Sequence, residues 1–126
     1  MSVKFNVVER GIPADNEAPK KFYPSILSSG RMRLRELANE IAAISTVSSA
    51  DTLAVLEGLL TVIPQQLGRG NIVELGDFGS FWLKANAAGA ESAEAVRASQ
   101  ISTLLPRFNP GKEFKRVLSE IEFQKA

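Results

Sequence analysis

Seven basic side chains in the second half of the chain have the residue type and positions that best suit contact with a polyanion. Lysine and arginine donate charge-assisted hydrogen bonds to phosphate oxygens and displace the counterions condensed on a nucleic acid. Three of them lie near the expected start of a helix, where the positive end of the helix dipole adds to their charge. An ordinary solvated helix face is the competing interpretation. The candidate phosphate contacts are Arg69, Lys84, Arg97, Arg107, Lys112, Lys115 and Arg116.

Composition limits the other chemistries that are open to this chain. The 126 residues include no cysteine and no histidine, which excludes disulfides, zinc fingers, thiol catalysis and histidine-based acid–base catalysis. Carboxylate pairs such as Glu91/Glu94 and Glu120/Glu122 have no partner that would suggest a catalytic site. We therefore expect no enzyme activity, no metal, no cofactor and no small-molecule substrate, although carboxylate chemistry is left open.

Charge and hydropathy limit which partners and which cell compartment we expect for this chain. With 15 basic and 14 acidic residues the net charge is +1, low for a dedicated nucleic-acid binder, so a local basic patch has to carry any such binding. The first residues, MSVKFNVVERG, contain no run of seven apolar residues, and no segment is apolar enough to span a bilayer. We expect a single cytoplasmic domain without a signal peptide or a membrane contact.

Two strands and a glycine turn are expected over residues 70–84. Val73 and Leu75 alternate with a polar residue, and the alternation resumes at Phe81 after the turn. Gly76 and Gly79 allow the chain to reverse with positive φ angles. A further strand is expected over residues 100–108, after a weakly patterned segment over residues 85–99.

Two helices are expected before these strands, over residues 31–44 and 50–67. Ser48, with Asp51 three residues later, is a capping-box-like start for the second helix. That helix is apolar on nearly every side, which indicates a partner subunit. Pro64 predicts a kink or break inside it.

A third helix is expected at the C-terminus. Asn109 followed by Pro110 is a helix-start signal. Phe114, Val117, Leu118 and Ile121 recur at i, i+3, i+4 and i+7, the spacing of a buried helical stripe.

Two short motifs in these elements resemble the bacterial histone-like HU/IHF family of DNA-architectural proteins. Val-x-Leu-x-x-Phe-Gly-x-Phe is present from Val73 to Phe81, and Phe-x-Pro-Gly-Lys from Phe108 to Lys112, in the order and at the separation of the family. The resemblance covers roughly residues 33–126 and extends to longer variants with an N-terminal extension. It implies an α+β fold with two N-terminal helices, a three-stranded antiparallel sheet whose β-ribbon forms an arm, a C-terminal helix, and an intertwined homodimer or heterodimer with a paralogue.

The expected domain organisation follows from this resemblance. Residues 31–126 form the HU/IHF-like DNA-binding domain, with its arm at about 85–99. Residues 1–30 form an N-terminal extension, in which residues 3–9 are rich in strand formers and residues 11–30, with three prolines, are expected to be a surface loop or a poorly ordered arm.

The arm departs from the family pattern. DNA-kinking members carry a proline at the arm tip among basic residues, whereas residues 86–95 contain no proline and no basic residue and include Glu91 and Glu94. HU and IHF are among the minor-groove binders that insert apolar wedges between base pairs.

The expected function is a histone-like, nucleoid-associated and DNA-condensing protein that contacts double-stranded DNA with low sequence specificity. The alternative is an HU-fold structural or protein-interaction module that has lost DNA bending or binding. DNA bending and an RNA or protein partner are left open.

Overall fold

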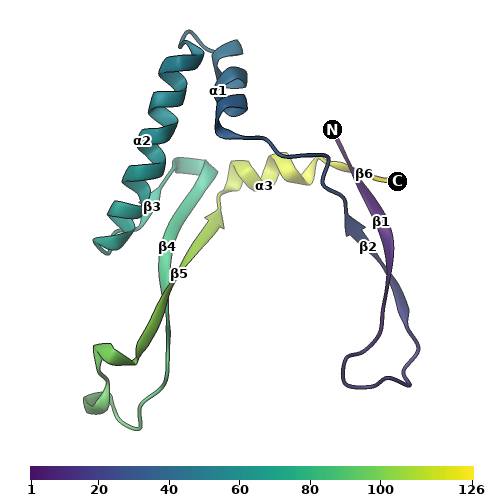
Figure 1. The fold of residues 1–126 in the computed structure, drawn as a ribbon, viewed down its shortest axis with the longest axis vertical. Coiled ribbons are helices and arrows are strands. Elements are labelled where there is room, and N and C mark those ends of the chain that lie inside the picture. Colours follow the sequence, from purple (N-terminus) through teal and green to yellow (C-terminus); the bar gives the residue numbers. More distant parts are fainter. The chain divides into compact units, whose positions relative to one another are not determined.

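The computed structural model describes all 126 residues, which form two compact units. One unit is Leu34–Arg116, and the other combines Met1–Arg33 with Val117–Ala126. No helix has the length and apolar character that crossing a bilayer requires. The elements in chain order (Figure 1) are β1 (Ser2–Arg10), β2 (Lys21–Ile26), α1 (Leu34–Ala43), α2 (Ser49–Gly68), β3 (Val73–Glu74), β4 (Gly79–Ala87), β5 (Ile101–Pro110), α3 (Lys112–Ser119) and β6 (Glu122–Lys125), with single 3-10 turns at 76–78, 93–95 and 98–100.

Helices α1 and α2 form an antiparallel pair in the Leu34–Arg116 unit. The Ser48 side chain accepts a hydrogen bond of 3.1 Å from the Asp51 backbone N–H, which confirms the predicted start of α2. The helix continues without interruption through Pro64, so the predicted break is absent. It ends at Gly68, and Gly70, two residues later, adopts a φ of +88° that favours glycine.

A three-stranded antiparallel sheet, in the order β3-β4-β5, follows the helices and is called the ribbon sheet here. Val73 pairs with Phe81 across β3 and β4, and Phe81 pairs with Phe108 across β4 and β5. Beyond the sheet, β4 and β5 continue as a two-stranded ribbon down to the 3-10 turns of its tip (Figure 1). The expected α+β class, antiparallel sheet and ribbon arm are confirmed.

The turn before β4 and the start of α3 each require a glycine. Gly79 has a φ of +146°, and a Cβ atom there would lie 2.6 Å from the Asn109 carbonyl oxygen. A Cβ atom on Gly111 would lie 2.2 Å from the Asp77 carbonyl oxygen. Only glycine lets these backbones approach so closely, so the two sequence motifs meet at one crossing point.

The start of the third helix differs from the expectation. Strand β5 continues through Asn109 and Pro110, and α3 begins at Lys112, where the Gly111 carbonyl accepts from the Lys115 N–H at 3.0 Å. Asn109 is therefore a strand residue paired with Ser80 and not the helix cap. The pairing with β4 supplies ladder hydrogen bonds that a local helix-start signal does not reveal.

The Met1–Arg33 and Val117–Ala126 unit is built on a second sheet, in the order β2-β1-β6, called the extension sheet here. Strand β1 pairs antiparallel with β2 and parallel with β6. The expected strand at residues 3–9 is present. However, Lys21–Ile26 is a strand and not part of a loop, and the C-terminal helix ends at Ser119, two residues before Ile121. The final residues are a strand because β1 offers them a pairing edge.

Candidate nucleic-acid interface

The ribbon brings two of the predicted basic residues to one face. Arg107 lies directly opposite Trp82, and Lys84, two residues further along β4, lies opposite Leu105. Since side chains alternate between the two faces of a sheet, Lys84 and Arg107 are diagonal neighbours with Cβ atoms about 7–8 Å apart. Both are exposed, and neither forms a salt bridge.

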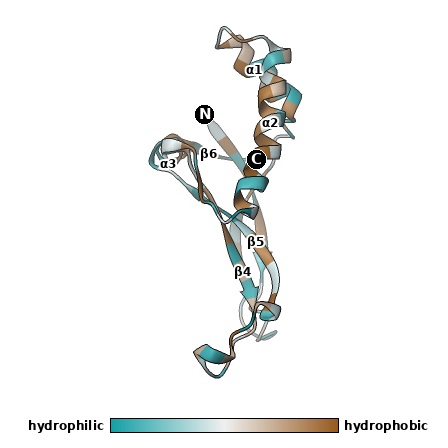
Figure 2. Cartoon of the chain, turned by 90° about the vertical axis from the view of Figure 1, so that its left-hand side faces the viewer, coloured by the Kyte–Doolittle hydropathy of each residue, from teal (hydrophilic) through white to brown (hydrophobic).

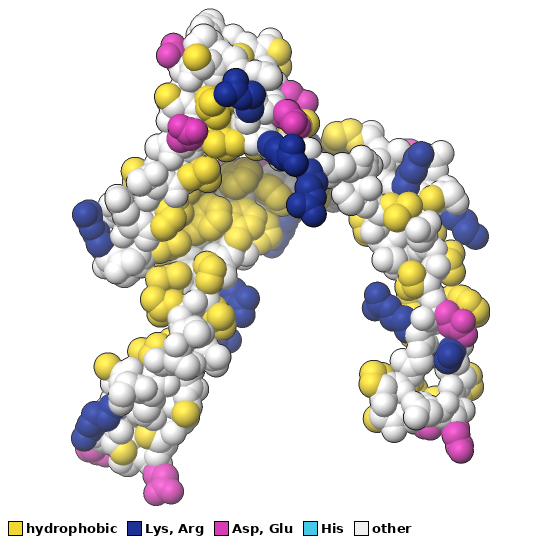
Figure 3. All heavy atoms as spheres, viewed as in Figure 1, with side chains coloured by type: hydrophobic (Ala, Val, Ile, Leu, Met, Phe, Trp, Pro, Cys, Tyr) yellow, Lys and Arg dark blue, Asp and Glu magenta, His cyan; other side chains and the backbone are white.

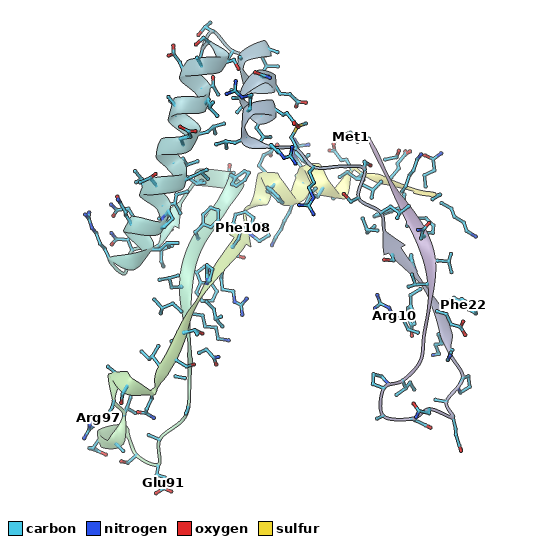
Figure 4. The ribbon with its side chains drawn as sticks, in the orientation of Figure 1. Met1, Arg10, Phe22, Glu91, Arg97 and Phe108 are labelled. Atoms are coloured by element: carbon cyan, nitrogen blue, oxygen red, sulfur yellow. The ribbon has the colours of Figure 1, made fainter.

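The other face of the same strands carries an aromatic cluster. The Phe81 and Phe108 ring centroids are 5.0 Å apart, Phe108 lies 5.6 Å from Phe114, and Phe78 lies 5.1 Å from Phe114. Edge-on and tilted geometries of this kind are favourable for aromatic packing. Phe108 lies where β5 meets α3 (Figure 4), so the cluster joins the ribbon to the helix that carries Lys112, Lys115 and Arg116. These phenylalanines pack against one another, although Phe78 and Phe108 remain partly exposed.

Helix α3 exposes Lys112 and Lys115, which form no salt bridge. Arg116 differs, because its Nε donates to both carboxylate oxygens of Glu113 at 3.0 Å and its terminal nitrogen also contacts that carboxylate. The hydrogen bond from Arg116 lowers the pKa of Glu113 below its ordinary value of 4.5. Of the three predicted helix residues, Arg116 is thus the one whose charge is already partly neutralised within the chain.

The two remaining candidates lie apart from these groups along the chain. Arg69 is the exposed C-terminal cap of α2. Arg97 lies in the ribbon tip, where its guanidinium donates to the carbonyl oxygens of Glu94 at 2.6 Å and Val96 at 3.0 Å. Figure 4 shows Arg97 and Glu91 at this tip, so the end of the ribbon carries acidic groups beside its single arginine. Arg97 helps to hold the tip conformation.

One basic group was not among the sequence-based candidates. Arg10 lies directly opposite Lys21 in the extension sheet, and Lys4 lies on the same face further along β1. Like charges in directly opposed positions repel, and none of the three forms a salt bridge. The alternation of Lys4 and Asn6 with Val3, Phe5 and Val7 was the signal for a two-faced strand, and Arg10 falls in the same phase as Lys4.

Comparison with known proteins decides the family. A family model described as an HU domain fused to wHTH, Ig, or Glycine-rich motif matches residues 1–125. The chain belongs to this HU family. Because the match begins at residue 1, the extension sheet of this HU-family chain lies within the family model and not outside it.

Individual relatives agree with this assignment. The chain is 34% identical to the DNA-binding protein HU of Buchnera aphidicola, over 71% of this HU-family chain and all of that protein. It is 27% identical to the protein of the same name from Thermus thermophilus, over 64% of this chain and 84% of that protein.

Two solved structures resemble the fold. The Anabaena HU–DNA cocrystal structure aligns with 71% of this chain and 99% of that chain, with a TM-score of 0.57 and 25% identity. A crystal structure from Bacteroides vulgatus aligns with 97% of this chain, with a TM-score of 0.66 and 10% identity. This chain spans about half (47%) of the Bacteroides chain, and at that identity the likeness concerns the fold.

Proposed function

We propose that this HU-family chain is a non-catalytic architectural protein that binds double-stranded DNA through its backbone with little sequence preference. The observation that carries the proposal is the unpaired Lys84 and Arg107 on one face of the ribbon, with the aromatic cluster on the other face. Exposed cations on a rigid strand pair suit contact with phosphates, which fix position without reading sequence. The role is that of a nucleoid-associated protein in the cytoplasm, and it needs no cofactor, small-molecule substrate or membrane.

The proposed contacts are not equally placed for this role. Lys84, Arg107, Lys112 and Lys115 carry free charges and form the proposed phosphate-binding set. Arg97 and Arg116 are secondary in the proposal, because each already forms hydrogen bonds within the chain. Arg69 is secondary because it caps α2 and lies on neither the ribbon nor α3.

We further propose that the working form is a dimer, of two identical copies or of this chain with a paralogue. The buried apolar core of the single chain consists of Ala38 and Leu67, while Val55 on α2 is 69% exposed and Leu60 is 58% exposed. Figure 2 shows hydrophobic segments along α2, and in Figure 3 hydrophobic side chains line a hollow in the part that holds α2 and the start of the ribbon. Patches of this kind mark interfaces in soluble proteins. A second copy also doubles every phosphate contact.

The arm of this chain suits DNA binding without insertion of an apolar side chain between base pairs. Residues 86–95 have no proline and no basic residue, and they carry Glu91 and Glu94. Carboxylates near phosphates repel them and forfeit counterion release. We therefore propose that the phosphate contacts come from α3 and from the part of β4 and β5 that holds Lys84 and Arg107. The tip of the ribbon does not insert between base pairs in this proposal.

Salt-dependent binding tests the proposal. The four free cations, counted twice in a dimer, set an upper limit of about −7 for the slope of log K against log salt on a duplex. The double variant Lys84→Ala/Arg107→Ala removes four of these contacts and should reduce the slope by about 3 to 4. Fluorescence anisotropy with a labelled duplex of about 30 base pairs, between 50 and 200 mM salt, measures both slopes.

A charge-matched control shows whether a change in slope comes from the loss of the proposed phosphate contacts or from the lower net charge of the variant. Lys20→Ala/Arg35→Ala removes two exposed cations outside the proposed set and should leave the slope almost unchanged. If the dimer shows no measurable binding at about 50 mM salt, the DNA-binding proposal is wrong. Competition with double-stranded RNA of the same length decides between the two nucleic acids.

A second function is favoured by the acidic arm tip and the net charge of +1. Under that alternative, the HU fold serves as a structural or protein-interaction module without DNA. The variant Glu91→Lys/Glu94→Lys distinguishes the two. It strengthens existing binding if the chain is a DNA-binding protein, and it creates binding where the original chain has none if the fold serves only as a protein module.

A further inference from the structure

The extension sheet has one basic face and one mainly apolar face. Residues at alternate positions of β1 share a face with their partners on the neighbouring strands. Figure 4 shows Phe22 and Arg10 projecting from opposite sides of the hairpin. The face that holds Arg10 is called the basic extension face here, and its members are Ser2, Lys4, Asn6, Val8 and Arg10 from β1, Lys21, Tyr23 and Ser25 from β2, and Glu122 and Gln124 from β6.

The positive charge of the basic extension face is not compensated within the chain. Lys4, Arg10 and Lys21 are exposed, and none of them forms a salt bridge. Glu122 is the one acidic member, and it lies in the row of the sheet farthest from Arg10 and Lys21. The acidic residues of the loop over 11–20 lie outside the sheet and pair with none of these cations. Three cations against one carboxylate leave the face with a net charge of +2.

Two of these cations are placed where they destabilise the sheet unless an anion binds. Arg10 and Lys21 are directly opposed in the ladder, and like charges in such positions repel. Glu9 is next to Arg10 in the sequence, but it lies opposite Phe22 and so belongs to the other face. A phosphate above the pair accepts charge-assisted hydrogen bonds from both cations and replaces the repulsion with attraction. The pair therefore favours an anionic ligand on this face.

The residues between the cations, and the length of the face, suit the backbone of a nucleic acid. Asn6 lies opposite Ser25, and Tyr23 is the next β2 residue on the same face. Amide and hydroxyl side chains donate to phosphate oxygens, as lysine and arginine do. Lys4 and Arg10 are six residues apart along β1, about 20 Å. A duplex carries about twelve phosphate charges over that length, so one straight duplex offers a phosphate to each cation.

We propose that the basic extension face is a second phosphate-contacting surface, which binds the backbone of double-stranded DNA in addition to the contacts from the ribbon and α3. A polyanion suits it better than a small anion, because the cations are spread along β1 and not gathered around one point. The inference rests on the proposed DNA-binding function and gives the N-terminal extension a part in it. Three further cations per copy extend the limit of the salt slope in a dimer from about −7 to about −13.

Two charge-matched lysine variants test the proposal with the same anisotropy measurement. Lys4→Gln/Lys21→Gln removes two cations from the basic extension face and should reduce the slope by about 3 to 4. Lys20→Gln/Lys125→Gln is the control, because Lys20 lies in the loop and Lys125 on the other face of the same sheet, and it should leave the slope almost unchanged. Without DNA, the first variant should have a Tm at least as high as the control, because it loses the repulsion between residues 10 and 21. A weaker slope then reports lost contacts and not unfolding.

The chain's single tyrosine and single tryptophan report separately on the two surfaces. Tyr23 is 43% exposed on the basic extension face, whereas Trp82 lies opposite Arg107 on the ribbon. A saturating duplex should slow the nitration of Tyr23 by tetranitromethane several-fold, measured by mass spectrometry, and should quench the emission of Trp82. Both effects should disappear at about 1 M salt, where the Debye length is about 3 Å.

The outcomes distinguish this inference from the DNA-binding proposal. An unchanged slope in Lys4→Gln/Lys21→Gln, with Trp82 quenched and Tyr23 unprotected, would overturn the inference and leave the ribbon contacts standing. A reduced slope in this variant but not in Lys84→Ala/Arg107→Ala would support the inference and contradict the ribbon contacts. No binding by the natural chain at about 50 mM salt would remove both. A variant that binds the duplex as the control does, but no longer binds vesicles of anionic lipid, would assign the face to a membrane surface and overturn the inference.

Discussion

Replacing Gly111 with alanine tests whether the crossing of the two sequence motifs holds the ribbon and α3 together. In the native structure the Gly111 N–H donates to the Phe78 carbonyl at 2.8 Å. A Cβ atom at residue 111 would lie 2.2 Å from the Asp77 carbonyl oxygen, 2.6 Å from its carbonyl carbon and 2.9 Å from the Gly79 nitrogen. All three neighbours are backbone atoms, so no side chain can rotate to make room.

The magnitude follows from two effects. Relieving the overlap requires a backbone shift, which typically costs about 1–3 kcal/mol. The same shift breaks the hydrogen bond to Phe78, a further loss of about 0.5–1.5 kcal/mol. Together they predict that Gly111→Ala lowers the free energy of unfolding by about 2–4 kcal/mol. For a chain of this length that corresponds to a fall of about 10 °C in Tm.

Thermal and urea unfolding, followed by far-UV circular dichroism at one fixed protein concentration, measure this loss. The concentration must be fixed because an associating protein gains stability by mass action. Gly89→Ala is the matched control, since a Cβ atom there meets nothing within 4 Å and its φ is not positive. A Gly111→Ala variant as stable as the Gly89→Ala variant would show that close backbone approach is not the reason for glycine at position 111.

Two further predictions concern single side chains. Ser48→Ala removes the cap on the Asp51 N–H and should lower the free energy of unfolding by about 1 kcal/mol, measured by urea denaturation against Ser29→Ala as a control. Arg116→Gln should raise the pKa of Glu113 toward its ordinary value of 4.5, measured by a carbon-13 NMR titration of the carboxylate. Because this pKa is lowered in the folded chain, the pair's contribution to folding is complete above the ordinary carboxyl pKa and disappears as the pH falls through the lowered value. An unchanged titration in Arg116→Gln would show that the pair does not cause the shift.

Local signals in the sequence predicted the elements that local interactions stabilise. Ser48 begins α2 because its hydroxyl meets a backbone N–H three residues later, within one turn. Gly76 and Gly79 mark the turn before β4 because positive φ angles are inexpensive only for glycine. Pro64 was misleading as a sign of a break, because α2 remains helical on both sides of it, from Ser49 to Gly68.

Elements that depend on distant partners were not predictable in the same way. Pro24 suggested a loop, yet an edge strand tolerates proline where the N–H faces away from the neighbouring strand. Ile121 continues a helical spacing that the chain abandons, because Phe123 pairs with Val3 across almost the whole length of the chain. No periodicity within a window of ten or fifteen residues contains that pairing.

Residue types and their spacing by themselves predicted the glycine turns, the capped helix and the list of basic side chains, and the resemblance of two short motifs to the HU/IHF family implied the α+β class. Tertiary structure alone decided which of those charges are free. Register places Lys84 and Arg107 on one face, whereas hydrogen bonds commit Arg97 to the ribbon tip and an ion pair commits Arg116 to Glu113. It also decided that both chain ends form one sheet with an apolar face. The physical reason is that conformational preferences act over neighbouring residues, while charge pairing and strand pairing depend on which distant atoms the fold brings together.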